Sequence, residues 1–165
     1  MTLKIYTLIH VLISLIGILS GLVVLFGLLT AKRLDGWTKC FLTTTLLTSV
    51  TGFFFPFHGF TPALVTGIIS LVALEIAIFA RYARHLAGEW RKTYVINAVI
   101  ALYLNVFVLI AQLFLKVPVL KQLAPKQTEP PFAITQLLVL GNFIVLGVIA
   151  AKTFSNNPSS PESKK

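Results

Sequence analysis

Residues 51–63 read TGFFFPFHGFTPA, a stretch with five phenylalanines, two prolines, one histidine (His58) and no charged residue. The stretch interrupts an uncharged segment, residues 40–74, that is too long for one membrane helix, because a bilayer core of about 30 Å needs roughly 20 helical residues. Pro56 disfavours helical geometry in the residue before it, and Pro62 suits the first position of a new helix. The sequence therefore predicts a tight turn between two membrane helices, with His58 at its tip.

The composition excludes a water-soluble globular domain. The 165 residues are 56% hydrophobic and only 12% charged, whereas soluble domains carry about 25% charged residues. Charged residues delimit further uncharged segments at 5–31, 93–115 and 130–151, each long enough for one crossing. With the two helices around the turn, the sequence predicts an all-α bundle of five transmembrane helices, at 3–31, 39–55, 62–85, 93–115 and 132–153.

The predicted bundle forms one membrane domain, residues 1–154, followed by a polar tail, residues 155–165, that we expect to be disordered in the cytoplasm. The first apolar run is too long for a signal peptide, so we expect the first helix to be retained. The net charge of +9 does not indicate nucleic-acid binding, because the basic residues flank the apolar segments instead of gathering on one soluble face.

The distribution of basic residues predicts an orientation. In a five-helix layout, Lys4, Lys116, Lys121 and Lys126 lie on one side of the membrane. Cytoplasmic loops carry the excess of Lys and Arg, which predicts the N-terminus outside and the C-terminus inside. The residues on the richer, cytoplasmic side are Lys32, Arg33, Lys39, Arg81, Arg84, Arg91, Lys92, Lys152, Lys164 and Lys165.

A polar side chain is expected at a similar depth in every helix, near the middle of the membrane. Glu75 is the one acidic residue deep in an apolar segment, and a carboxyl group there has to be protonated, hydrogen-bonded or hydrated. It is either the titrating group of a proton or ion site or a neutral member of a packing layer. The predicted midplane layer consists of Glu75, Asn105, Asn142, Ser20, Thr48 and Ser49.

Two histidines are candidate ligands on the outer side. His10 lies near the outer end of the first helix and His58 lies in the outer turn, so together they are able to ligate haem b or a metal ion. The alternative is that His58 is only the polar tip of a turn. The single cysteine, Cys40, excludes an intrachain disulfide and a site with several cysteine ligands.

Other motifs point to packing and not to catalysis. Gly17 and Gly21 are spaced four residues apart, which lets helix backbones approach closely, either within this chain or in a homo-oligomer. The sequence contains no nucleotide-binding loop, serine-nucleophile elbow or HExxH zinc signature.

Two stretches carry a resemblance to known proteins. GFFFPFHGFTP at 52–62 and LKVPVLKQLAPKQTEPPF at 115–132, with ALYLNVFVLIAQ between them, resemble a group of small bacterial multi-pass membrane proteins of no established activity. The resemblance covers the second to the fifth helix. It implies a location in the bacterial inner membrane and brings no cofactor, activity or partner.

Three hypotheses of function follow from the sequence. The first is a non-enzymatic structural or accessory subunit of a membrane complex, surrounded by the lipid bilayer and bound to a membrane-protein partner. The second is a proton- or ion-translocating bundle centred on Glu75. The third is an electron-transfer module with haem or a metal between His10 and His58.

Overall fold

The computed structural model describes residues 2–56 and 62–156, and all regular elements in these two ranges are helices. The all-α class predicted from the sequence is confirmed. His58 and the tail residues 157–165 lie outside the described residues. The elements are α1 (Thr2–Leu29), α2 (Asp35–Gly52), α3 (Pro62–Ile78), the π-helix η1 (Phe79–Ala83), α4 (Trp90–Lys116), α5 (Pro118–Leu123) and α6 (Pro130–Asn156).

Within the described residues, four helical segments are long and apolar enough to cross a membrane: Leu3–Leu29, Leu64–Ala83, Trp90–Lys116 and Pro130–Asn156. By length and composition these segments make the chain a multi-pass membrane protein. The remaining long helix, α2, carries charges in its first turns and several threonines, so its hydropathy is lower than that of the four spans. The fifth crossing predicted over residues 39–55 is therefore not among the candidate spans.

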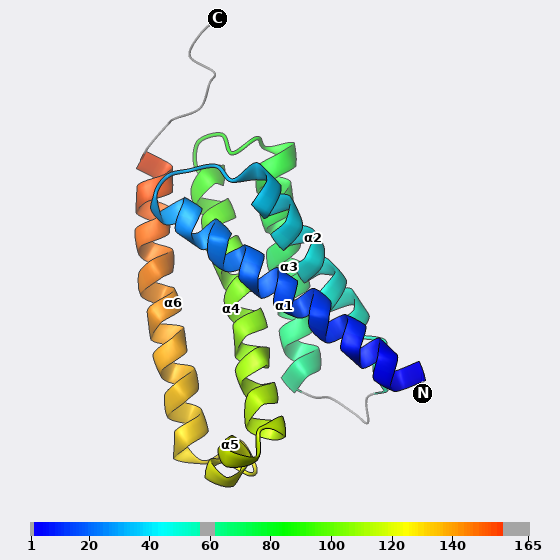
Figure 1. Ribbon diagram of the computed structural model, residues 1–165. Helices are drawn as coiled ribbons and strands as arrows, with labels where there is room; N and C mark the ends of the chain where they lie inside the picture. The colour runs from blue at the N-terminus through cyan, green and yellow to red at the C-terminus, as the bar shows by residue number, and fades with distance from the viewer. Residues whose placement is uncertain (1, 57–61, 157–165) are drawn as a thin grey trace, which may run out of the picture.

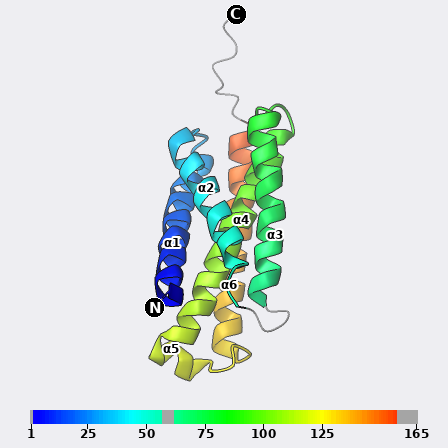
Figure 2. The same cartoon turned by 90° about the vertical axis from the view of Figure 1, so that its right-hand side faces the viewer.

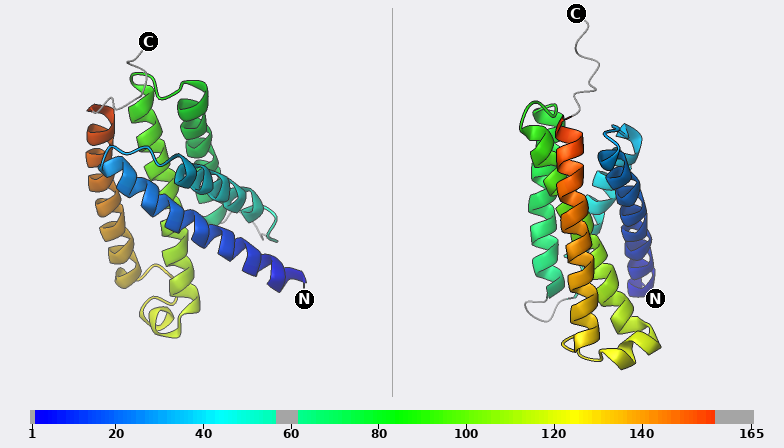
Figure 3. Two further views of the ribbon diagram at one scale, coloured as in Figure 1. Left: turned by 45° about the horizontal axis from the view of Figure 1, so that its top comes forward. Right: turned by 90° about the vertical axis from the view of Figure 1, so that its left-hand side faces the viewer.

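The long helices alternate in direction along the chain. In Figure 1, α3, α4 and α6 run roughly parallel to one long axis of the molecule, while α1 and α2 lie side by side and cross them obliquely. Figures 2 and 3 show the α1–α2 pair against one side of the other three helices. The start of α1 lies toward the end that carries α5, and α6 ends at the opposite end (Figure 1).

The central helix is α4, which contacts α1, α2, α3 and α6. Its side chains Tyr94, Val95 and Leu102 are buried with Phe41 of α2 and Leu74 of α3 in one hydrophobic core. We call the end of the bundle where η1 ends, α4 begins and α6 ends the basic end, because Arg81, Arg84, Lys92 and Lys152 gather there.

Several element boundaries differ from those predicted. The second helix begins at Asp35 instead of Lys39, because an acidic side chain in the first turn is favourable to the helix dipole. It ends at Gly52, ahead of the predicted Phe55. The third helix was expected to reach residue 85, but its hydrogen bonding changes at Phe79 and the helix ends at Ala83.

At the other end of the bundle, the short helix α5 was not predicted. Pro118 occupies its first position, where the missing N–H costs nothing. The flanking helices α4 and α6 each extend a few residues beyond the predicted bounds, and α6 continues through Ser155 and Asn156, which were assigned to the tail.

Gly17 and Gly21 lie where α1 meets its neighbours. A Cβ atom on Gly17 would approach Thr44 Oγ1 of α2 to 3.1 Å, and one on Gly21 would approach Leu102 Cδ1 of α4 to 2.5 Å and the Phe41 ring of α2 to 2.8 Å. Both glycines therefore allow close contacts between helices of this chain.

Candidate functional site

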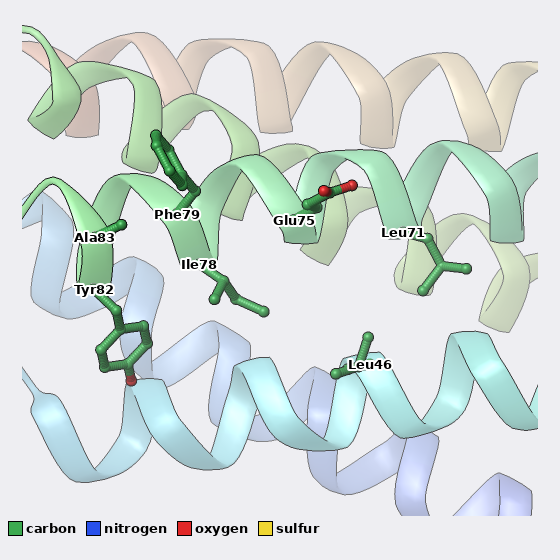
Figure 4. A pocket seen from close by; sticks show the side chains of 7 residues that line it. All are labelled: Leu46, Leu71, Glu75, Ile78, Phe79, Tyr82 and Ala83. Carbon is green, nitrogen blue, oxygen red and sulfur yellow. The ribbon is translucent and has the colours of Figure 1, made fainter.

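Glu75 lies on the outer surface of the bundle. Its side chain is exposed and lines a groove of about 520 Å³ that α2, α3 and η1 form together. Figure 4 shows Glu75 on the α3 wall of this groove and Leu46 facing that wall from α2. Among the described residues, Glu75 has no hydrogen-bond or ion-pair partner. The other lining residues are Leu71, Ile78, Phe79, Tyr82 and Ala83.

Glu75 lies near the middle of a candidate membrane span. The candidate span runs from Leu64 to Ala83, so at 1.5 Å per residue Glu75 lies about 16 Å from one end and about 12 Å from the other. A carboxyl group that faces lipid at this depth is costly unless it is protonated, hydrogen-bonded or paired. The groove around Glu75 is therefore the candidate functional site.

Two pairs of polar side chains join α2 to its neighbours inside the bundle. Asn105 of α4 is buried and its Nδ2 donates a hydrogen bond to Thr45 Oγ1 at 3.2 Å. Ser49 donates to Ser70 Oγ of α3, also at 3.2 Å. Thr48 lies between these pairs in the sequence of α2, and its buried hydroxyl has no partner among the described residues. Most of the interior polar groups are thus used in contacts between the protein's own helices.

The remaining members of the predicted midplane layer make no polar contact with another helix within the described residues. Ser20 donates to the carbonyl oxygen of Ile16 in its own helix at 2.7 Å. Asn142 is exposed on α6 and donates to Leu138 O, again in its own helix, at 2.9 Å. Glu75 faces outward as well. Depth along a helix does not determine direction around it, and each residue turns the side chain by about 100°.

At the C-terminal end of α2, His10 takes part in a small polar cluster. Its Nδ1 lies 2.8 Å from Thr51 Oγ1, and its ring meets the Phe55 ring edge-on at a centroid distance of 5.0 Å. Because the Thr51 hydroxyl already donates to Leu47 O at 2.6 Å, His10 Nδ1 is the donor to Thr51. Tyr6 donates to Thr51 O at 2.6 Å, so the cluster joins the start of α1 to the end of α2.

The predicted pair of outer ligands is described only in part. His10 is placed, but His58 lies outside the described residues, so the distance between them is not defined. Within the described ranges, no group of three or more His, Cys, Asp or Glu side chains lies close enough together to hold a metal ion.

Sequence reasoning missed a buried charge at the basic end. Arg81 of η1 is only 6% exposed, and its guanidinium pairs with the carboxylate of Asp35 in the first turn of α2. The same guanidinium lies 5.4 Å from the centroid of the fully buried Tyr94 ring and 5.7 Å from that of Tyr82. One signal was available: Arg81 lies three residues, almost one helical turn, deeper in its apolar segment than Arg84.

Arg81 lies within a π-helical turn. Arg84 N donates to Phe79 O at 3.0 Å and Leu86 N donates to Ala80 O at 3.0 Å, so these bonds span five and six residues instead of four. A π-helical turn shifts the register of the side chains around the axis, and such turns are frequent at functional sites. Here the shift accompanies a buried Arg81 beside exposed Tyr82 and Ala83 at the groove.

No protein-family model, curated protein or solved structure matches the chain. The resemblance noted for residues 52–62 and 115–132 therefore stays a prediction, and the chemistry of the site rests on its geometry alone. That geometry is a carboxyl group that has no partner among the described residues, in a groove whose lining is apolar apart from Glu75 and Tyr82. The Arg81–Asp35 pair joins the walls of the groove at one end. Such a site is suited to binding an apolar surface that carries one hydrogen-bond donor.

Proposed function

We propose that the chain is a non-enzymatic accessory subunit of a membrane complex, and that one transmembrane helix of a partner protein docks in the groove beside Glu75. The observation that carries this proposal is the exposed Glu75 side chain near the middle of a span, without a partner among the described residues. A partner helix that places a hydrogen-bond donor beside the carboxyl group removes the cost of exposing it to lipid.

The groove also defines the chemistry of the partner. Leu46, Leu71, Ile78 and Phe79 make its walls apolar, so the docked helix presents an apolar face. At the level of Glu75 that face carries a lysine, arginine, asparagine or glutamine side chain, because these residue types donate hydrogen bonds to a carboxyl oxygen. If a second copy of this chain docks in the groove instead of a different protein, the size of the complex and the identity of the crosslinked chain reveal it.

We further propose five crossings, with α2 as the fifth, in the bacterial inner membrane. The 18 residues of α2 span about 27 Å, close to the bilayer core of about 30 Å. Its polar side chains Thr45 and Ser49 are buried against other helices, so lipid does not solvate them. The excess of Lys and Arg at the basic end supports the C-terminus inside and the N-terminus outside.

The two alternatives are supported less well by the geometry. Proton or ion translocation through Glu75 needs polar groups in contact with it, whereas Tyr82 is the one other polar residue of its groove. Electron transfer through haem or a metal uses His10 together with His58, which lies outside the described residues. Docking of a partner helix depends only on residues that the structure places.

The proposal is tested by the size of the complex in native membranes. Membranes from the source cells, expressing the tagged chain at its natural level, are solubilised in mild detergent and separated by native electrophoresis. We expect a complex larger than the monomer that is lost in Glu75→Leu and retained in Glu75→Gln, because glutamine still forms hydrogen bonds.

The matched control is Asn142→Leu, which removes an exposed polar side chain from another span. We expect this variant to leave the complex unchanged, since Asn142 Nδ2 already bonds its own helix. A wild-type chain that migrates only as a monomer contradicts the proposal, and so does a complex that survives Glu75→Leu.

A further inference from the structure

A second groove lies between α4 and α6, on different elements from the Glu75 groove, and also has a volume of about 520 Å³. Its floor consists of Val99, Phe143, Gly147 and Ala151. A Cβ atom on Gly147 would approach Val99 Cγ1 to 3.2 Å, so the glycine allows the two helices to lie close together under the groove. The floor is apolar along its whole length.

The length of this groove matches one leaflet of a bilayer. Its lining extends from Lys92 to Tyr103 on α4 and from Leu140 to Lys152 on α6, which is about 17 Å along the helix axes. Half of a hydrocarbon core of about 30 Å is about 15 Å. The groove therefore runs from the basic end of the bundle to about the middle of the membrane, the depth over which a lipid acyl chain extends.

Both charged residues of the lining lie at the same end of the groove. Lys92 is near the start of α4 and Lys152 is near the end of α6, and the two helices are antiparallel (Figure 1). Both side chains are exposed, and neither forms an ion pair with an acidic residue of the described ranges. Lysine side chains at the membrane surface attract anionic lipid headgroups.

The chemistry of the lining distinguishes between occupants. A lipid combines a hydrocarbon chain, which suits the apolar floor, with an anionic group at the membrane surface, which suits the two lysines.

We propose that the groove between α4 and α6 binds one anionic phospholipid, with an acyl chain on the apolar floor and the phosphate between Lys92 and Lys152. The lysines select the headgroup by its charge. The apolar floor binds the acyl chain and makes no distinction between headgroups. The site does not depend on Glu75 or on a partner helix.

The test uses native mass spectrometry of the delipidated full-length protein. Phosphatidylglycerol and phosphatidylcholine with identical acyl chains are added separately, and the fraction of protein with one bound lipid is followed. We expect the wild type to prefer phosphatidylglycerol. In the double variant Lys92→Gln/Lys152→Gln we expect the affinity for phosphatidylglycerol to fall roughly 10- to 30-fold, since each lysine near the surface contributes to anion attraction, and that for phosphatidylcholine to stay unchanged.

The control is Lys116→Gln/Lys121→Gln, which removes the same charge at the opposite end of the bundle. We expect it to bind phosphatidylglycerol as the wild type does. Val148→Trp fills the groove from an exposed lining position and should weaken the binding of both lipids to the same extent. Circular dichroism and melting in detergent show whether each variant is folded.

Four results would overturn the assignment. The first is equal affinity of the wild type for the two lipids. The second is an equal loss of affinity for phosphatidylglycerol in the two lysine double variants. The third is displacement of phosphatidylglycerol by millimolar inorganic phosphate, which would indicate a site for bare phosphate in place of a lipid. If Val148→Trp is folded and binds both lipids as the wild type does, the acyl chain lies outside this groove and the assignment is also wrong.

Discussion

The guanidinium of Arg81 in η1 is paired with the carboxylate of Asp35 in the first turn of α2, although the two residues are far apart in the sequence. The pair joins the two walls of the Glu75 groove at the basic end. It is asymmetric, because the Arg81 side chain is 5% exposed and the Asp35 side chain is 62% exposed. Solvent thus reaches the acid while the base is enclosed by protein.

The pair predicts that Asp35→Ala is destabilising, because it leaves the buried Arg81 without its counter-charge. Breaking a buried pair costs about 3–5 kcal/mol. Since Asp35 is partly exposed to solvent, we expect about 1–3 kcal/mol here. Melting in mild detergent measures the loss. The control is Arg33→Ala, whose side chain reaches Asp35 only at 3.9 Å. Equal melting temperatures for the two variants would refute the role of the pair.

Gly21→Ala should destabilise the bundle by about 1–3 kcal/mol, because the added methyl group meets Leu102 and the Phe41 ring in a filled space. The matched control is Gly141→Ala on α6, where an added Cβ meets nothing within 4 Å. Unfolding of both variants in the same detergent separates the packing effect from the change in helix propensity. A wild-type melting temperature for Gly21→Ala would show that α1 is not packed as described.

Thr51→Val should loosen the contact between the start of α1 and the end of α2, because it removes the acceptor of the His10 Nδ1–H bond. Hydrogen bonds between membrane helices contribute about 0.6 kcal/mol on average. The expected loss of stability is therefore small and confined to this contact. Hydrogen exchange followed by mass spectrometry should show faster exchange near His10. Thr7→Val, whose hydroxyl bonds only its own helix, is the comparison and should exchange as the wild type does.

Glu129, just before α6, predicts a pH dependence. Desolvation opposes its ionisation, but the N–H groups of Lys126 and Thr128 donate hydrogen bonds to the carboxylate and, with the Lys126 charge, hold the pKa of Glu129 below its usual value. A lowered folded-state pKa stabilises the fold above the unfolded-state pKa, and this contribution is lost as the pH falls through the folded-state pKa.

The melting temperature should therefore fall less steeply with acid in Glu129→Gln than in the wild type. The comparison is made between pH 7 and about pH 3, which brackets the ordinary pKa of a glutamate. Parallel curves for the two proteins would contradict the role assigned to the carboxylate.

The membrane spans could be predicted from the sequence because a charged residue inside hydrocarbon is costly. Charges therefore delimit the helices, and Pro62 is indeed the first residue of α3. The short helix α5 and the π-helical turn at Phe79 could not be predicted, since hydropathy carries no information on hydrogen-bond register. The burial of Arg81 could not be predicted either, because an arginine near a membrane boundary usually extends toward the lipid headgroups.

The direction of each side chain could not be predicted either. The segment Leu64–Ala83 is apolar nearly all round, so no hydrophobic face shows which side packs inward. Asn105 and Asn142 have similar predicted depths, yet the first is buried against Thr45 and the second is exposed. For the same reason, the outward position of Glu75 emerges only from the packing of α2, α3 and α4.

Site-specific photocrosslinking in native membranes tests the docking of a partner helix most directly. A photoreactive amino acid replaces Leu71 in the Glu75 groove, and a second chain carries it at Leu137, an exposed position on α6. We expect the Leu71 probe to give one discrete protein adduct that is strongly reduced by Glu75→Leu, while the Leu137 probe labels lipid. The crosslinked peptide should come from an apolar helix with a lysine, arginine, asparagine or glutamine near the site. An adduct unaffected by Glu75→Leu, or only lipid adducts at Leu71, would contradict the proposed docking.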